Sequence, residues 1–174
     1  MSRARGRAIW ALGVLTLLGA CAQGPADLDT LAPPEPDAQR LRAQRRLQLA
    51  TAYYVHQQDE VAQQEARAAL AIDPRYPEAY ALLALVHQRQ GTPTLAEQSY
   101  RQALALAQAG ATHANERASI AHNYGWFLCQ QGRPLEGQGH LHAALTTTGY
   151  LSTDKTRQAL QACQLSHNSS HHER

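Results

Sequence analysis

The feature that most constrains the fold of this chain is a period of 34 residues in the placement of small and large side chains. Small residues recur at offsets of 0, 12 and 19 within each copy of the period. They are Ala50, Ala62 and Ala69 in one copy and Ala84, Ala96 and Ala103 in the next. Small side chains at such offsets let two antiparallel helices approach closely, so the period predicts stacked helical pairs.

Residues 77–108 show what one copy contains. Two apolar-periodic runs, Tyr80 to Gln90 and Leu95 to Leu106, flank the breaker Gly91-Thr92-Pro93. This pattern predicts a helix, a tight turn and a second helix. Neither helix can bury its apolar stripe alone, so neighbouring copies must supply the rest of the core.

A third copy is offset from the second. Gly125 takes the place of Ala84, but the distance between them is 41 residues, so about seven extra residues (around 109–115) lengthen a helix or its loop. Gly137 and Gly139, in the second helix of this copy, are poor helix formers and suggest a weaker C-terminal end. A final helix over 154–165 has no partner and fits the role of a cap.

The period and the order of small and large residues resemble the tetratricopeptide repeat. The resemblance implies an all-α fold, a tetratricopeptide-repeat superhelix of about three and a half helix-turn-helix repeats over residues 38–165. Asp59 is the expected N-cap of the second helix, and the polar tail 166–174 is expected to be disordered. The helices are expected over 41–57, 61–72, 80–90, 95–106, 115–131, 135–146 and 154–165.

The chain begins with a segment typical of export. Three arginines precede an apolar run over 8–18, which is too short to span a bilayer and suits a signal peptide. The run ends in Leu-Leu-Gly-Ala-Cys at 17–21, which resembles the bacterial lipobox and implies a lipoprotein signal peptide over 1–20 with lipidation of Cys21. Because Ala22 and not Asp follows, the lipoprotein family pattern implies the periplasmic face of the outer membrane. The alternative is an ordinary signal peptide with a chance cysteine.

Residues 21–37 contain four prolines and are expected to form a flexible tether without helix. Removal of the three leader arginines leaves 13 Lys and Arg against 14 Asp and Glu, so no basic surface argues for nucleic acid. No nucleophile, carboxylate or histidine pattern of an enzyme is present, and neither a cofactor nor a small-molecule substrate is expected. The nine histidines do not form a metal motif, since His140 and His142 point to different helix faces.

Cys129 and Cys163 are 34 residues apart, which is one repeat period. Both fall at the same position of the first helix in adjacent repeats, and such helices lie side by side. In an oxidising periplasm two such cysteines usually pair, so a disulfide is expected. Two buried free thiols remain the alternative, because packed helix axes leave some pairs too far apart to bridge.

The first helices of tetratricopeptide solenoids line a concave groove, which is the candidate binding surface for a partner helix or strand. Tyr54, Leu85 and Trp126 are expected to form an apolar strip along it, unless Tyr54 and Trp126 simply pack between repeats as core. The candidate groove residues are Leu47, Thr51, Tyr54, Val55, Ala81, Leu85, Gln88, Arg89, His122, Trp126 and Gln130, with Cys129 on the same helix face.

One string is more specific than the general repeat. His-Asn-Tyr-Gly-Trp-Phe-Leu-Cys at 122–129, followed by Gln-Gln-Gly-Arg, resembles the type IV pilus biogenesis and stability lipoproteins, the PilF/PilW family. The resemblance implies a pilotin: a lipid-anchored protein that helps the pilus secretin reach the outer membrane and form multimers. Typical members continue through about six repeats, so this chain is short for the family. The alternative function is an outer-membrane adaptor that recruits peptidoglycan or other envelope-biogenesis enzymes.

Overall fold

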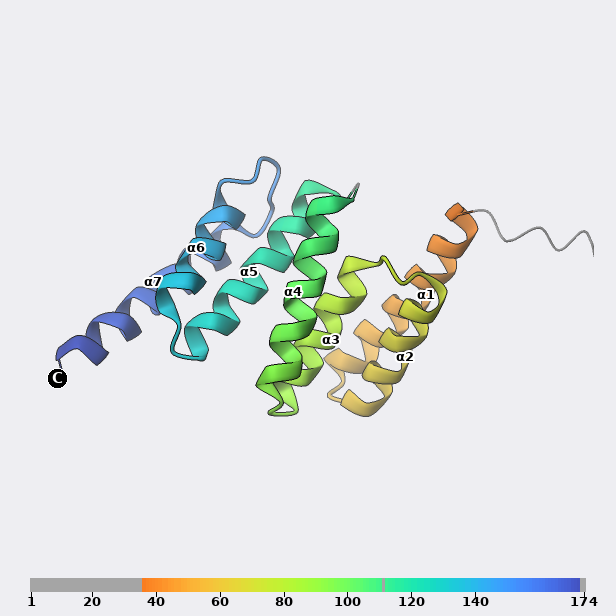
Figure 1. Ribbon diagram of the computed structural model, residues 1–174, viewed down its shortest axis with the longest axis horizontal. Coiled ribbons are helices and arrows are strands. Elements are labelled where there is room, and N and C mark those ends of the chain that lie inside the picture. The colour runs from red at the N-terminus through yellow and green to blue at the C-terminus, as the bar shows by residue number, and fades with distance from the viewer. Residues whose placement is uncertain (1–35, 111, 173–174) are drawn as a thin grey trace, which may run out of the picture. The chain divides into compact units, whose positions relative to one another are not determined.

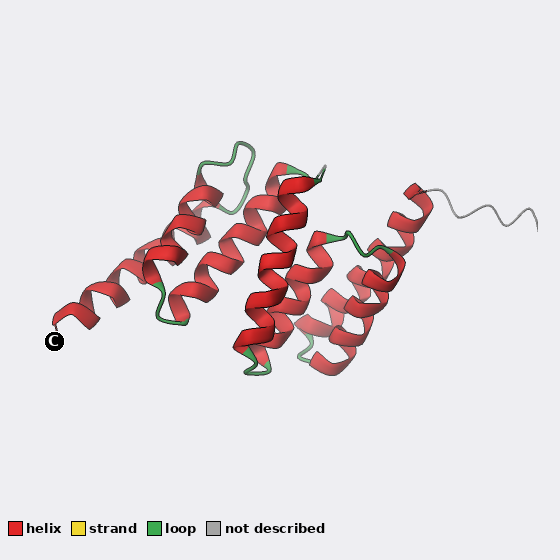
Figure 2. Cartoon of the chain, viewed as in Figure 1, coloured by secondary structure: helices red, strands yellow, loops and turns green. Residues whose placement is uncertain are grey.

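The computed structural model describes residues 36–110 and 112–172, which form seven α-helices and no strand (Figures 1 and 2). Connections of three or four residues join consecutive helices, except for the seven residues 146–152 between the last two. Among these helices, none is both long and apolar enough to cross a membrane. The helices are α1 (Pro36–Val55), α2 (Asp59–Ile72), α3 (Pro77–Arg89), α4 (Pro93–Ala109), α5 (Ala114–Gln130), α6 (Pro134–Leu145) and α7 (Thr153–His172).

The helices pack as the hairpins α1/α2, α3/α4 and α5/α6, and α7 closes the array against α6 and α5 (Figure 1). The odd-numbered helices also contact one another in the order α1, α3, α5, α7. No such contact joins the even-numbered helices within the described part of the chain. The odd-numbered helices are therefore the closer-packed row, and they line the inner face of the array, as the tetratricopeptide pattern predicts.

The small residues of the period lie where the helices touch. All six alanines at offsets 0, 12 and 19, from Ala50 to Ala103, are fully buried. Gly125 and Ala144 occupy the corresponding places in the third copy and are buried too. The all-α repeat fold expected from the sequence is confirmed.

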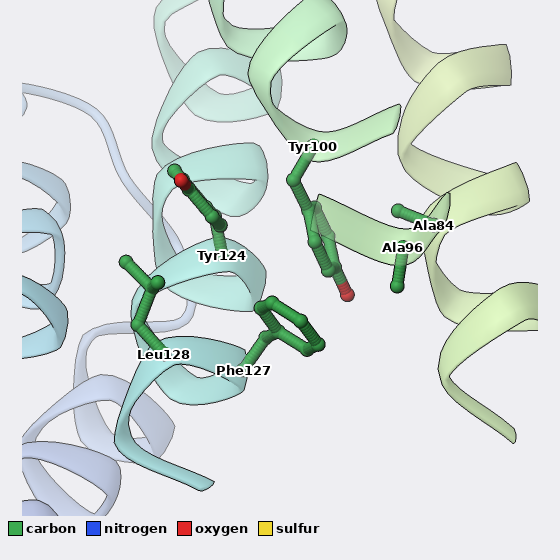
Figure 3. Close-up of a cluster of buried hydrophobic side chains, with 6 residues drawn as sticks. All are labelled: Ala84, Ala96, Tyr100, Tyr124, Phe127 and Leu128. Atoms are coloured by element: carbon green, nitrogen blue, oxygen red, sulfur yellow. The ribbon is translucent and has the colours of Figure 1, made fainter. Parts of the chain in front are cut away.

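The largest side chains of the core meet between the second and third hairpins (Figure 3). Tyr100 of α4 is fully buried, and its ring centroid lies 5.5 Å from that of Tyr124 and 5.4 Å from that of Phe127, both on α5. Tyr100 has room because it stands beside Ala84 and Ala96, whose side chains are single methyl groups. Its hydroxyl donates to Gln88 Oε1 at 3.1 Å, so the buried phenol is not left unpaired.

The seven extra residues of the third copy extend two helices and do not lengthen a loop. Helix α4 has 17 residues against 14 in α2, and α5 has 17 against 13 in α3. The loops that follow α2 and α4 each contain four residues. The insertion is therefore divided between the end of α4 and the first turn of α5, where residues 114–117 are additional.

Gly137 allows α5 and α6 to approach closely, which corrects the expectation that it only weakens α6. A Cβ atom on Gly137 would lie 2.5 Å from the carbonyl oxygen of Gly125, closer than atoms pack. A Cβ on Gly125 would lie 2.7 Å from the carbonyl oxygen of Gly137. Gly139, two residues later in the same helix, has nothing within 4 Å of such an atom.

Several predicted boundaries were wrong by a few residues. Gln58, not Asp59, is the N-cap residue of α2, and it makes no side-chain capping hydrogen bond. Helix α1 begins at Pro36, inside the predicted tether, and α7 continues to His172, so most of the predicted disordered tail is helical. The predicted signal peptide, Cys21 and the tether up to residue 35 lie outside the described residues.

A disulfide joins α5 to α7. The Sγ atoms of Cys129 and Cys163 are 2.02 Å apart, and the Cα atoms are 5.5 Å apart. The bond lies in a cluster with Leu141, Trp126 and Leu160, which belong to three different helices. Because α7 is the last described helix, the bond fastens the element that has a neighbour on one side only.

Replacing Gly137 with Ala is expected to destabilise the protein, because the new methyl group forces α5 and α6 apart. The matched Gly139→Ala variant is expected to gain about 0.5–1 kcal/mol, the usual benefit of Ala over Gly within a helix. Thermal unfolding followed by circular dichroism measures both. Equal shifts for the two variants would show that the close approach is unimportant.

Reduction of the disulfide is expected to lower the free energy of unfolding by about 2–4 kcal/mol, because the cross-link restricts a long loop in the unfolded chain. Hydrogen exchange should accelerate first in α7, and the Cys129→Ser/Cys163→Ser variant should behave like the reduced protein. Uniform loss of protection across all helices would contradict this local role.

Candidate partner-binding groove

A pocket of about 260 Å³ lies on the inner face, where α1, α3 and α5 meet. Its floor is mainly apolar, and each of the three helices contributes to it. The array forms such a pocket because the first helices of successive repeats lie side by side with small residues between them. The lining residues are Leu47, Thr51, Glu78, Ala81, Leu82, Leu85, Glu116, Ser119, Ile120 and Asn123.

Four of the predicted groove residues, Leu47, Thr51, Ala81 and Leu85, come together in this pocket. Thr51 is exposed at the edge, whereas Ala81 is buried in the floor. Leu47 and Leu85 are half-buried and also pack against the core. Half-buried leucines in a concavity offer apolar area to a partner while keeping a fixed position.

Tyr54 and Arg89 contact each other and join the first two repeats. The Arg89 guanidinium lies 3.7 Å from the centroid of the Tyr54 ring and donates to the Tyr54 carbonyl oxygen at 2.7 Å. It also binds both carboxylate oxygens of Asp59, with Nε at 2.8 Å from each. Asp59 therefore anchors Arg89 and does not cap α2.

The remaining predicted groove residues have other neighbours. Gln88 donates to Gln130 Oε1 at 2.7 Å and joins α3 to α5. His122 shares a 2.8 Å hydrogen bond with Thr156 of α7, and burial, followed by the charge of Lys155, lowers the pKa of this imidazole. Val55 is 68% exposed at the end of α1.

Trp126 is half-buried and packs against the cluster around the disulfide. Cys129, placed on the same face by its spacing, is buried in that cluster. Tyr54 and Leu85 pack against the same core cluster, with Arg89 over the Tyr54 ring and Leu85 also lining the pocket, whereas Trp126 belongs to a separate cluster beside α7. The pocket of α1, α3 and α5 is the part of the predicted groove with open apolar surface from several repeats.

Two carboxylates in the pocket were not predicted from the sequence. Oε2 of Glu78 and Oε2 of Glu116 are buried and have no hydrogen-bond partner among the described residues. Burial raises the pKa of the Glu78 carboxyl, and the charge of Glu116 adds to the rise, whereas the Glu78 backbone N–H and Arg40 oppose it. Both residues lie in the first turn of a helix, where acidic side chains are common, so their positions alone do not single them out.

The described residues contain no cluster of three or more His, Cys, Asp or Glu side chains that could hold a metal ion. His140 lies against Tyr124, with ring centroids 4.7 Å apart, and burial lowers its pKa. The chemistry that this face offers is apolar contact combined with negative charge, which suits binding of another molecule.

No protein-family model matches the chain. The type IV pilus assembly protein PilF of Pseudomonas aeruginosa is 36% identical over 104 residues, which are 60% of this chain and 38% of PilF. The matched segment thus spans well under half of that relative.

Solved structures extend the comparison. Pseudomonas aeruginosa PilF superposes with a TM-score of 0.65 and 33% identity over 72% of this chain and 54% of that chain. PilW, a widely conserved type IV pilus biogenesis factor, superposes with a TM-score of 0.63 and 28% identity over 70% of this chain and 53% of that chain. The Yersinia enterocolitica type III secretion chaperone SycD, in complex with a YopD peptide, superposes with a TM-score of 0.57 and 18% identity over 70% of this chain and 92% of that chain. This similarity concerns the fold alone. The chain is therefore homologous to PilF and shares the tetratricopeptide-type helical fold of PilF and PilW.

Proposed function

We propose that this protein acts in type IV pilus assembly as a pilotin-like scaffold that binds an outer-membrane secretin and promotes its localisation and multimerisation. The observation that carries the proposal is the homology to PilF, a type IV pilus assembly protein, over 60% of the chain. The PilW likeness supports the same process.

The pocket between α1, α3 and α5 is the proposed secretin-binding site. It combines an apolar floor with contributions from three repeats, which is the form of surface that holds a helix or an extended segment of another protein. The relatives named above are an assembly protein, a biogenesis factor and a chaperone. A binding role without catalysis agrees with them.

In this proposal the N-terminal part of the chain attaches the protein to the outer membrane. Residues 1–20 are a lipoprotein signal peptide, Cys21 carries the lipid at the periplasmic face of the outer membrane, and residues 22–35 act as the tether. Multiple acyl chains hold a protein firmly, whereas one holds it weakly. Anchoring would concentrate the groove at the membrane in which the secretin assembles.

Replacing Thr51 with Trp is expected to fill the pocket and reduce the amount of secretin multimer in outer membranes several-fold, because an indole occupies the volume that the partner needs. Gln98→Trp, which adds the same side chain at an exposed position on α4, is the matched control and should leave multimers unchanged. Both variants must retain the wild-type melting temperature. Normal multimers in the Thr51→Trp strain would exclude this pocket as the secretin site.

Replacing Cys21 with Ser is expected to release the protein from the outer membrane and to leave secretin subunits as monomers or in the wrong membrane. Membrane fractionation followed by immunoblotting of both proteins measures this. Recovery of peptidoglycan enzymes with the wild-type protein, together with normal secretin multimers in the variant, would favour the envelope-adaptor function instead.

A further inference from the structure

Glu78 and Glu116 face the same pocket from two different helices, α3 and α5. Each has one buried oxygen atom that no described residue hydrogen-bonds. A carboxylate in the first turn of a helix interacts well with the backbone N–H groups there, which accounts for its presence but not for a second, buried and unpaired oxygen. Such an oxygen destabilises the fold as long as it remains unpaired.

Two arginines have other partners: Arg40, whose charge acts on Glu78, and Arg117, which follows Glu116 in the chain. Arg40 donates to Asp73 Oδ2 at 2.5 Å and lies 4.3 Å from the centroid of the Tyr76 ring. Arg117 donates to the carbonyl oxygen of Thr112 at 3.5 Å. Neither guanidinium has a hydrogen bond to the pocket oxygens, although Arg40 and His113 act on Glu78 through their charge.

The charges of Glu78 and Glu116 also act on the phenol of Tyr76. Burial, followed by the charge of Glu78, raises the pKa of Tyr76 to about 12, and Asp73 and Glu116 act in the same direction. Arg40 opposes them. The two carboxylates of Glu78 and Glu116 make this side of the pocket suitable for a positive charge, and the adjoining floor of Leu47, Leu85 and Ile120 is suited to apolar side chains.

We propose that this pocket selects a segment of a partner protein in which a lysine or arginine is flanked by apolar residues. The cation lies between Glu78 and Glu116 and hydrogen-bonds their free oxygens, and the flanking side chains cover the apolar floor. A charged hydrogen bond in a desolvated pocket is among the contacts that dominate binding. The inference rests on the groove of the proposed function, but it does not require that the partner be a secretin.

A bound metal ion fits the pocket less well. Two carboxylates supply few of the six to eight oxygen ligands that Ca²⁺ takes, and the rest of the lining is mostly apolar. A long side chain with a terminal cation satisfies both parts of the lining at once, because its methylene groups cover apolar surface while its head pairs with the carboxylates.

The test is a selection of randomised short peptides displayed on phage against the full-length protein, repeated with the Glu78→Gln/Glu116→Gln variant. Peptides that the wild type enriches should carry Lys or Arg next to apolar residues, and this preference should disappear with the variant. A synthetic copy of the most enriched peptide should lose affinity about tenfold or more on the variant. Replacing its basic residue by Gln should have the same effect.

Stability measurements separate recognition from folding. Glu78→Gln and Glu116→Gln should leave the melting temperature unchanged or raise it, since each replaces a carboxylate that has one buried oxygen without a hydrogen bond from any described residue. The control is Glu97→Gln, whose carboxylate accepts from Arg133 Nη1 at 2.7 Å; it should lower the melting temperature and leave peptide affinity unchanged. A lower melting temperature for the two pocket variants would indicate a structural role and overturn the proposal.

The proposal also fails if no peptide is enriched, if enriched peptides lack basic residues, or if they bind the double variant equally well. These outcomes are distinguishable from failure of the pilus function. Loss of secretin multimers in the Thr51→Trp strain would retain the pilus function even if the peptide selection fails. Normal multimers in that strain, together with enriched basic peptides that the double variant does not bind, would retain the cation proposal and exclude the secretin as the partner.

Discussion

The structure depends on close contact between helices at positions where the side chain is a methyl group or a single hydrogen. Ala84 and Ala96 leave room for the ring of Tyr100, and Gly125 and Gly137 bring the backbones of α5 and α6 together. Where helices approach this closely, large side chains have to fill the seam between hairpins, and Figure 3 shows that they do. The inner face, and with it the pocket, follows from the packing of the odd-numbered helices against one another.

Much of the fold could be predicted from the sequence, because a small residue at a fixed offset has one simple structural use in a helical pair. The period predicted the hairpins, and the cysteine spacing placed Cys129 and Cys163 on adjacent helices. Spacing could not assign Gly137, since a glycine that weakens a helix and one that permits a close contact are the same residue in a sequence. The neighbours of Gly137 distinguish the two, because the carbonyl oxygen of Gly125 and the Sγ atom of Cys129 leave no room for a Cβ atom.

The candidate binding surface was predicted less well. Helical position put Leu47 and Leu85 on one face, and both line the pocket, but it could not show that Arg89 is held by Asp59 and Tyr54. Long polar side chains reach neighbours that periodicity does not specify. Part of the string at 122–129 belongs to the core, because Tyr124, Phe127 and Leu128 are buried between the second and third hairpins.

The irregular third copy affects where along the groove a partner would bind. The four additional residues at the start of α5 include Glu116, so the interruption of the period brings a second carboxylate to the pocket. A perfectly periodic groove presents equivalent sites one repeat apart, and an elongated ligand can slip between them. Here Glu78 and Glu116 come together at one place, so in the proposed binding mode a bound chain would have one preferred register.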